Sequence, residues 1–190
     1  MSVNAPKNQK IRTIYVSPGE IAVSTHNDVL HSTPLGSCVA VVMYDKTINI
    51  GGMAHVMLPG KAGNGSDNDQ FKYAANAIRG LLQKLQKAGA AIQNMEVCLV
   101  GGANVLKRPN DTIASEVAKS VLENMGAHHL KIAAFSLGGT ERRVALFTAN
   151  KSAVYYTLGN SEPRLLWNFN AFHSRQGIVP MNVDMSIQKL

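Results

Sequence analysis

Two spacings of apolar residues along the chain predict a mixed α/β protein. Apolar positions recur every three or four residues over 71–85 and 112–125, which is typical of amphipathic helices. We expect Asp69 to cap the first helix, and Gly89 and Gly126 to end the first and the second. Short apolar runs between turn residues predict strands at 11–16, 21–25, 39–44, 47–58, 95–100, 130–137, 143–148 and 153–158.

These elements predict a single-domain sandwich of β-strands with two main helices, over residues 11–158. The polar residues 1–10 are expected to be disordered, and residues 159–190, of mixed composition, to form a C-terminal extension. The first residues contain no apolar core of a signal peptide, and no apolar run is long enough to span a membrane. We therefore expect a cytoplasmic protein.

Charge and cysteine content exclude several functions. The net charge of +7 comes from dispersed residues, and its densest cluster, Arg142-Arg143, is interpreted as solvated surface. We expect no nucleic-acid binding. Cys38 and Cys98 lie in apolar runs, which favours free thiols in a reducing compartment over a disulfide framework.

Metal and nucleotide sites are not expected. On a strand, His128 and His129 would point to opposite faces, which makes them a poor metal pair. The glycine pairs at 101–102 and 138–139 follow predicted strands but fit no phosphate-loop or dinucleotide pattern. The sequence therefore predicts no cofactor and no metal.

Cys38 and His55 are the candidates for chemistry. Cys38 follows a Gly-Ser turn at the mouth of a strand, and His55 lies on the next apolar segment. If the hairpin closes around a four-residue loop at 45–48, the two residues pair directly, with Cβ atoms about 5 Å apart. A two-residue loop leaves His55 a diagonal neighbour on the same face. A three-residue loop requires a bulge, for which Gly51-Gly52 is the natural place.

Such a pair suits acyl transfer. A thiolate is the attacking form of cysteine, and a nearby protonated His55 would stabilise it. Backbone N–H groups of the turn formed by Gly36, Ser37 and Cys38 are candidate oxyanion donors. The motif contains no acidic residue, so the hydroxyl of Ser32 or Thr33 is expected to orient the imidazole. An isolated cysteine is more often a core residue, which is our interpretation of Cys98.

The motif resembles the chemoreceptor glutamine deamidase family, CheD. The resemblance rests on Leu-Gly-Ser-Cys-Val-Ala-Val at 35–41 and Met-Ala-His-Val-Met-Leu-Pro at 53–59. It continues through Lys72-Tyr73, Gly101-Gly102-Ala103 and Leu137-Gly138-Gly139, and covers about residues 12–158.

The resemblance implies a fold related to bacterial toxin deamidases and a Cys-His-Thr triad. The implied reaction converts glutamines of methyl-accepting chemotaxis receptors, on their cytoplasmic helical domain, to glutamates through a thioester. Cys38 would attack the carboxamide and His55 would protonate the departing ammonia. Some members also bind a CheC-type phosphatase.

The chain departs from the family pattern where the third triad member is concerned. The family threonine commonly lies six positions before the cysteine, where this chain has Ser32, and Thr33 is one residue nearer. Both hydroxyls therefore stay candidates. Two other functions also stay open: a non-catalytic adaptor that binds receptors or the phosphatase, and a Cys–His enzyme of another kind, such as a transglutaminase or peptidase.

Overall fold

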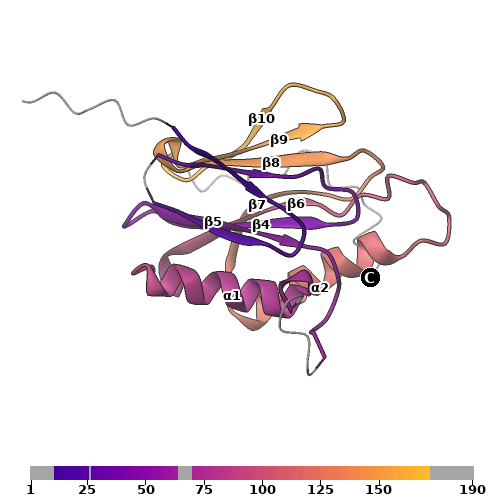
Figure 1. The fold of residues 1–190 in the computed structure, drawn as a ribbon, viewed down its shortest axis with the longest axis horizontal. Helices are drawn as coiled ribbons and strands as arrows, with labels where there is room; N and C mark the ends of the chain where they lie inside the picture. Colours follow the sequence, from indigo (N-terminus) through magenta and orange to yellow (C-terminus); the bar gives the residue numbers. More distant parts are fainter. Residues whose placement is uncertain (1–10, 26, 64–69, 172–190) are drawn as a thin grey trace, which may run out of the picture.

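The protein folds into three stacked layers (Figure 1). A computed structural model describes residues 11–25, 27–63 and 70–171. Sheet A contains, in spatial order, β1 (Thr13–Val16), β3 (Val29–Ser32), β8 (Arg143–Thr148), β9 (Ala153–Leu158) and β10 (Arg164–Asn168). Sheet B contains β2 (Ile21–Thr25), β5 (Ile50–Val56), β4 (Val39–Asp45), β6 (Met95–Gly101) and β7 (Lys131–Leu137).

Helices α1 (Ala74–Lys87) and α2 (Ile113–Ala127) lie against the face of sheet B that points away from sheet A (Figure 1). Short 3₁₀ turns occur at Gln70–Lys72, Ile92–Asn94 and Ala149–Lys151. The predicted α/β sandwich with two main helices is therefore confirmed. Among the described residues, no helix has the length and apolar character needed to cross a membrane.

The helices differ from the prediction at their ends. Tyr73 is the N-cap of α1, without a side-chain cap bond, and Asp69 lies outside the described residues, as do residues 1–10. Helix α2 continues through Gly126 to Ala127, so the predicted stop at Gly126 is wrong. The left-handed residue beyond the helix is His129, with φ of 53°. His128 and His129 thus end a helix instead of lying on a strand.

Two strands have no counterpart in the sequence prediction. Strand β3 is four residues long and contains His31 and Ser32, so its apolar signal is weak. Strand β10 lies within residues 159–190, and its pairing with β9 shifts register between Leu165 and Trp167. Part of the expected C-terminal extension therefore belongs to sheet A.

Sheet B separates two apolar cores. One lies between sheet B and the helices and includes Val41, Leu81 and Leu99. The other lies between the two sheets and includes Val42 and Phe147. Every residue of β4 is buried, because neighbouring side chains on this strand point alternately into the two cores.

Gly51 and Gly52 allow close packing on both faces of β5. A Cβ on Gly51 would lie 2.5 Å from Phe147 Cζ, and one on Gly52 would lie 2.7 Å from Leu81 Cδ1. The pairing of β5 with β4 runs through both glycines without a register shift. The glycines therefore admit neighbouring side chains from the two cores, and no bulge forms there.

Two alanine substitutions test this packing. Gly51→Ala should lower the free energy of unfolding by about 1–3 kcal/mol, because the added methyl group overpacks the core against Phe147. The matched control is Gly126→Ala on exposed helical backbone with open space around it, which should raise stability by roughly 0.5–1 kcal/mol. Urea denaturation measures both. A Gly51→Ala variant as stable as the unaltered protein would contradict the packing argument.

Candidate functional site

Cys38 lies one residue before β4, at the end of the sandwich where β6 and β7 finish. Its backbone is held by the segment that follows β6. Gly102 N–H donates to the Cys38 carbonyl at 2.8 Å, and Ala103 N–H donates to the Gly36 carbonyl at 2.8 Å. The turn that carries the thiol is therefore fixed to sheet B on both sides of Ser37.

Gly101 explains why this segment begins with glycines. Its φ of 125° is in a region that side-chain-bearing residues rarely adopt, and a Cβ there would lie 2.2 Å from the Cys38 carbonyl oxygen. The backbone of β6 thus approaches the backbone of Cys38 too closely for any side chain. The Gly101-Gly102 pair positions the candidate nucleophile.

Arg143 holds the same segment indirectly, through hydrogen bonds to the loop after β7. Gly138 N–H donates to the Gly101 carbonyl at 3.0 Å, and Arg143 Nη1 donates to the Gly138 carbonyl at 2.7 Å. Arg143 Nε also donates to Ser136 Oγ at 2.9 Å. Burial lowers the pKa of the guanidinium below its ordinary value. The interpretation of Arg142-Arg143 as solvated surface is wrong for Arg143, which is buried because it begins β8 on the inward-facing side.

His55 shares a face of sheet B with Cys38 but is not its direct partner. The hairpin pairs Ala40 with His55 and closes on the pair Asp45–Ile50. The loop is therefore four residues long, at 46–49 instead of 45–48, so the direct pairing of Cys38 with His55, one of the predicted alternatives, is off by two residues. His55 is a diagonal neighbour of Cys38, in a relationship where Cα atoms lie about 7–8 Å apart and long side chains still meet.

Asp45 accounts for this register. Its Oδ1 accepts hydrogen bonds from Thr47 N–H and Thr47 Oγ1, at 2.9 and 2.6 Å, and its Oδ2 accepts one from Ala91 N–H at 3.0 Å. These bonds hold Asp45 in the strand and start the turn after it. Asn49, with φ of 55°, completes the turn.

The imidazole of His55 is fully buried and is oriented from sheet A. Its Nδ1 lies 3.1 Å from the Val16 carbonyl oxygen and 3.4 Å from Thr33 Oγ1. A carbonyl can only accept, so Nδ1 carries the proton and Nε2 presents its lone pair. Within the described part of the chain, Nε2 has no hydrogen-bond partner.

Burial favours the neutral forms of both reactive groups. It lowers the pKa of His55, against smaller raising effects of the Val16 carbonyl and Glu20. It also raises the pKa of the half-buried Cys38 thiol, although the residue's own backbone N–H, which is directed at the sulfur, opposes this. Both directions favour the neutral thiol and imidazole, whereas the sequence analysis invoked a thiolate stabilised by protonated His55.

The two candidate hydroxyls have different partners. Ser32 is buried at the end of β3, and its Oγ accepts a hydrogen bond from Ala145 N–H at 2.9 Å. Thr33, one residue beyond the strand, brings its hydroxyl to His55 instead. Cys98 is fully buried between the two sheets, and burial raises the pKa of its thiol.

Val16 is the contributor to the site that sequence reasoning missed. Its carbonyl accepts from both His55 Nδ1 and Thr33 N–H, the latter at 3.2 Å. Because a backbone carbonyl acts here, the identity of the side chain gives no signal. The sequence indicates only that a strand ends at this residue, since the predicted strand covers residues 11–16.

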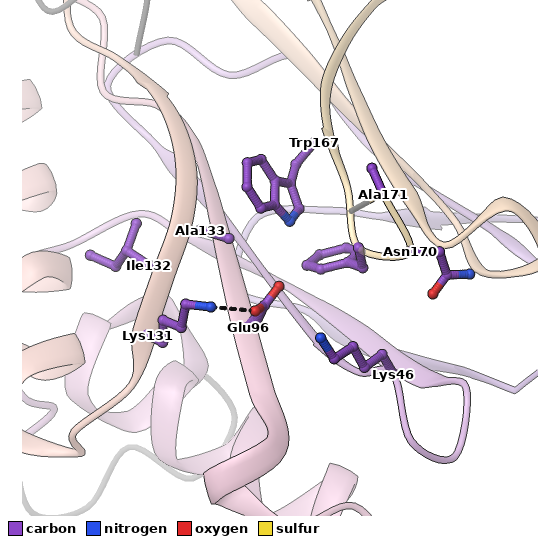
Figure 2. A pocket seen from close by; sticks show the side chains of 9 residues that line it. Lys46, Glu96, Lys131, Ile132, Ala133, Trp167, Asn170 and Ala171 are labelled. Atoms are coloured by element: carbon purple, nitrogen blue, oxygen red, sulfur yellow. Dashed lines mark hydrogen bonds and ion pairs between the residues drawn. The ribbon is translucent and has the colours of Figure 1, made fainter. Parts of the chain in front are cut away.

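Two cavities lie away from Cys38. One of about 480 Å³ opens at the other end of the sandwich, between Lys46, Glu96, Lys131 and Trp167, with the Lys131–Glu96 ion pair on its wall (Figure 2). The other, of about 400 Å³, is lined by residues that include Val16 and Glu20. Within the described ranges, no three His, Cys, Asp or Glu side chains are grouped as a metal site would require.

Comparison with known proteins agrees on one family. The family model described as CheD chemotactic sensory transduction matches residues 57–157, a range that begins after Cys38 and His55. A protein of Chlorobium luteolum, named probable chemoreceptor glutamine deamidase CheD, is 37% identical over 151 residues, which are 80% of this chain and 75% of the relative.

Two further relatives carry corresponding names. The chemoreceptor glutamine deamidase CheD of Thermotoga maritima is 34% identical over 125 residues, or 66% of this chain and 78% of that protein. The probable chemoreceptor glutamine deamidase CheD of Methanococcus maripaludis is 35% identical over 150 residues, or 76% of this chain and 94% of the relative. With matches of this extent, the chain belongs to the CheD family.

Proposed function

We propose that this protein hydrolyses the side-chain amide of chemoreceptor glutamines, with Cys38 as nucleophile and His55 as base. One observation carries the proposal: Nε2 of the fully buried His55 has no hydrogen-bond partner among residues 11–25, 27–63 and 70–171, and His55 shares a face of sheet B with Cys38. Leaving a buried polar atom unpaired costs about 1–3 kcal/mol, and such atoms call for a functional explanation. The names of the relatives supply the substrate.

The first half of the reaction forms a thioester. Nε2 of His55 takes the thiol proton as the Cys38 sulfur attacks the carboxamide carbon, and a C–S bond forms. The imidazolium then gives its proton to the amide nitrogen. The C–N bond breaks and ammonia leaves.

The second half returns the enzyme to its starting state. His55 removes a proton from a water molecule, which attacks the thioester carbonyl. The C–S bond breaks, the sulfur regains a proton from the imidazolium, and the product is glutamate. The carboxylic acid formed gives its proton to ammonia, so the sum is glutamine and water giving glutamate and ammonium, and no redox partner or cofactor is required.

Thr33 and Val16 serve as positioning groups for this cycle. The Val16 carbonyl keeps the proton on Nδ1, and the Thr33 hydroxyl is a second acceptor at longer range. Thr33 is our proposal for the third member of the triad, because the Ser32 hydroxyl is occupied by Ala145 N–H. The backbone N–H groups of Ser37 and Cys38 are the proposed oxyanion donors. The Gly36 carbonyl accepts from Ala103 N–H, so Ser37 N–H, in the same peptide unit, points the opposite way.

The free thiols indicate the compartment, and the family resemblance suggests a second partner. Cys38 and Cys98 are free thiols, and a nucleophilic thiol persists in a reducing compartment such as the cytoplasm. A CheC-type phosphatase is a proposed second partner, on the family resemblance alone. The alternative function is a non-catalytic adaptor for either partner, and loss of the thiol separates it from the enzyme.

Removing the thiol should abolish deamidation and leave the fold intact. We expect Cys38→Ala to lower the rate of glutamine-to-glutamate conversion at least about 10³-fold, because nothing replaces the nucleophile. Mass spectrometry of receptor cytoplasmic fragments detects the gain of about one dalton per converted glutamine, and ammonia release checks it. Conversion at an unchanged rate by Cys38→Ala would refute the assignment, and amine cross-linking or peptide cleavage by the unaltered protein would indicate another Cys–His enzyme.

The pH dependence should report a neutral thiol–imidazole pair. Because burial lowers the pKa of His55, kcat/KM should hold down to at least about pH 6.5, the ordinary value, and fall below it as Nε2 gains a proton. Alkylation of Cys38 should rise up to and beyond pH 9, since its thiol pKa is raised, and should exceed that of buried Cys98 throughout. Cys38 labelling that is already maximal at pH 6 would demonstrate a resting thiolate and contradict this.

Substitution of Thr33 should affect the reaction rate, whereas substitution of Ser32 should affect the stability of the fold. Thr33→Val should lower kcat about five- to tenfold at nearly constant KM, the worth of one net hydrogen bond, and Thr33→Ser should restore it. Ser32→Ala should instead lower the free energy of unfolding by about 1–3 kcal/mol, because Ala145 N–H loses its acceptor. Steady-state kinetics and urea denaturation on both variants check the assignment, and the reverse pattern would make Ser32 the positioning residue.

A further inference from the structure

An exposed apolar tip lies on the loop between β6 and α2, beside the candidate nucleophile. Val105 is 37% exposed and Leu106 is 67% exposed. The next two residues, Lys107 and Arg108, are exposed and basic. Single apolar residues on a surface are ordinary, but two neighbours next to a reactive thiol are a candidate for substrate contact.

The tip is attached directly to the turn that carries Cys38. Val105 Cγ2 lies 3.5 Å from the position that a Cβ on Gly36 would take. The residues just before it donate backbone hydrogen bonds to two other loops of the site: Ala103 to Gly36 at 2.8 Å and Asn104 to Gly139 at 2.9 Å. The apolar tip therefore has a fixed position relative to the thiol.

Asn104 also fixes the shape of the tip itself. Its Nδ2 donates to the Arg108 carbonyl at 2.9 Å, and its Oδ1 accepts from Arg108 N–H at 3.3 Å. Lys107 N–H donates to the Asn104 carbonyl at 3.1 Å, and Lys107 has a φ of 51°. The loop is thus ordered before any partner binds. Binding therefore does not include the free-energy cost of ordering this loop.

We propose that Val105, Leu106, Lys107 and Arg108 form a docking surface, the 105–108 tip, for the receptor segment that carries the target glutamine. This proposal rests on the proposed function. The occupant is a polypeptide with an apolar side chain that covers Leu106 and acidic side chains that meet Lys107 and Arg108. Charge supports this choice, since Lys107 and Arg108 are both exposed and the protein carries a net charge of +7, which attracts acidic partners.

The first test compares binding of a receptor cytoplasmic fragment to Cys38→Ala and to Cys38→Ala/Leu106→Ser by calorimetry. We expect the second change to raise Kd about tenfold, because the apolar contact of one leucine is lost. The matched control is Leu165→Ser, which removes a leucine 54% exposed on β10 and should leave Kd unchanged. An unchanged Kd with Leu106→Ser, or an equal rise with Leu165→Ser, would overturn the proposal.

Kinetics with the thiol present give a second readout. Leu106→Ser should raise KM for the receptor fragment about tenfold, keep kcat within about twofold, and leave deamidation of a short glutamine peptide unaltered. Equal losses on both substrates would overturn the docking role. If the unaltered protein deamidates neither substrate, the proposed function fails, and the calorimetric comparison still decides the docking surface.

Charge is tested separately with Lys107→Gln/Arg108→Gln. Binding of the unaltered surface should weaken as salt rises, and the double variant should bind less tightly at low salt with a flatter salt dependence. A salt dependence identical to that of the parent would overturn the acidic character assigned to the occupant.

Discussion

Burial of β4 on both faces is the constraint on which the candidate site depends. With sheet A on one side and the helices on the other, every side chain of this strand has to enter one core or the other (Figure 1). Ala40 and Val42 point between the sheets, and Cys38 continues that series just beyond the strand. The thiol therefore faces the same interior as His55, at the point where the sandwich opens and the thiol is only half-buried.

A chain of hydrogen bonds between neighbouring loops then fixes the position of the thiol. Arg143 holds the Gly138 carbonyl, Gly138 holds Gly101, and the Gly101-Gly102 segment holds Cys38. Arginine suits the first position because its planar guanidinium reaches Ser136 Oγ and a carbonyl together, which a lysine ammonium on a flexible stem reproduces poorly. Gly101 is thus explained by its close backbone approach to Cys38, whereas Gly138 and Gly139 are explained by φ angles of 81° and 72°, which favour glycine.

Local patterns predicted more of this structure than non-local ones. The helices, the β4–β5 hairpin and the shared face of Cys38 and His55 follow from apolar periodicity and the two-residue period of strands. The register did not, because Asp45 is held partly by Ala91, which is distant in sequence. The choice between Ser32 and Thr33 also required the structure, since it depends on the pairing of β3 with β8. No residue type could have indicated the Val16 carbonyl.

Burial of His55 affects how the catalytic pair can act when substrate binds. A dry environment keeps the imidazole neutral and its Nε2 able to accept a proton, yet Nε2 makes no hydrogen bond to the Cys38 sulfur in the structure. Catalytic contacts that are long in a free enzyme commonly tighten when substrate binds. A receptor segment seated on the 105–108 tip would lie beside Val105, which lies against the turn that carries the thiol. Docking on the tip would then select receptor glutamines through binding, while Cys38 and His55 supply the chemistry, so the two contributions affect KM and kcat separately.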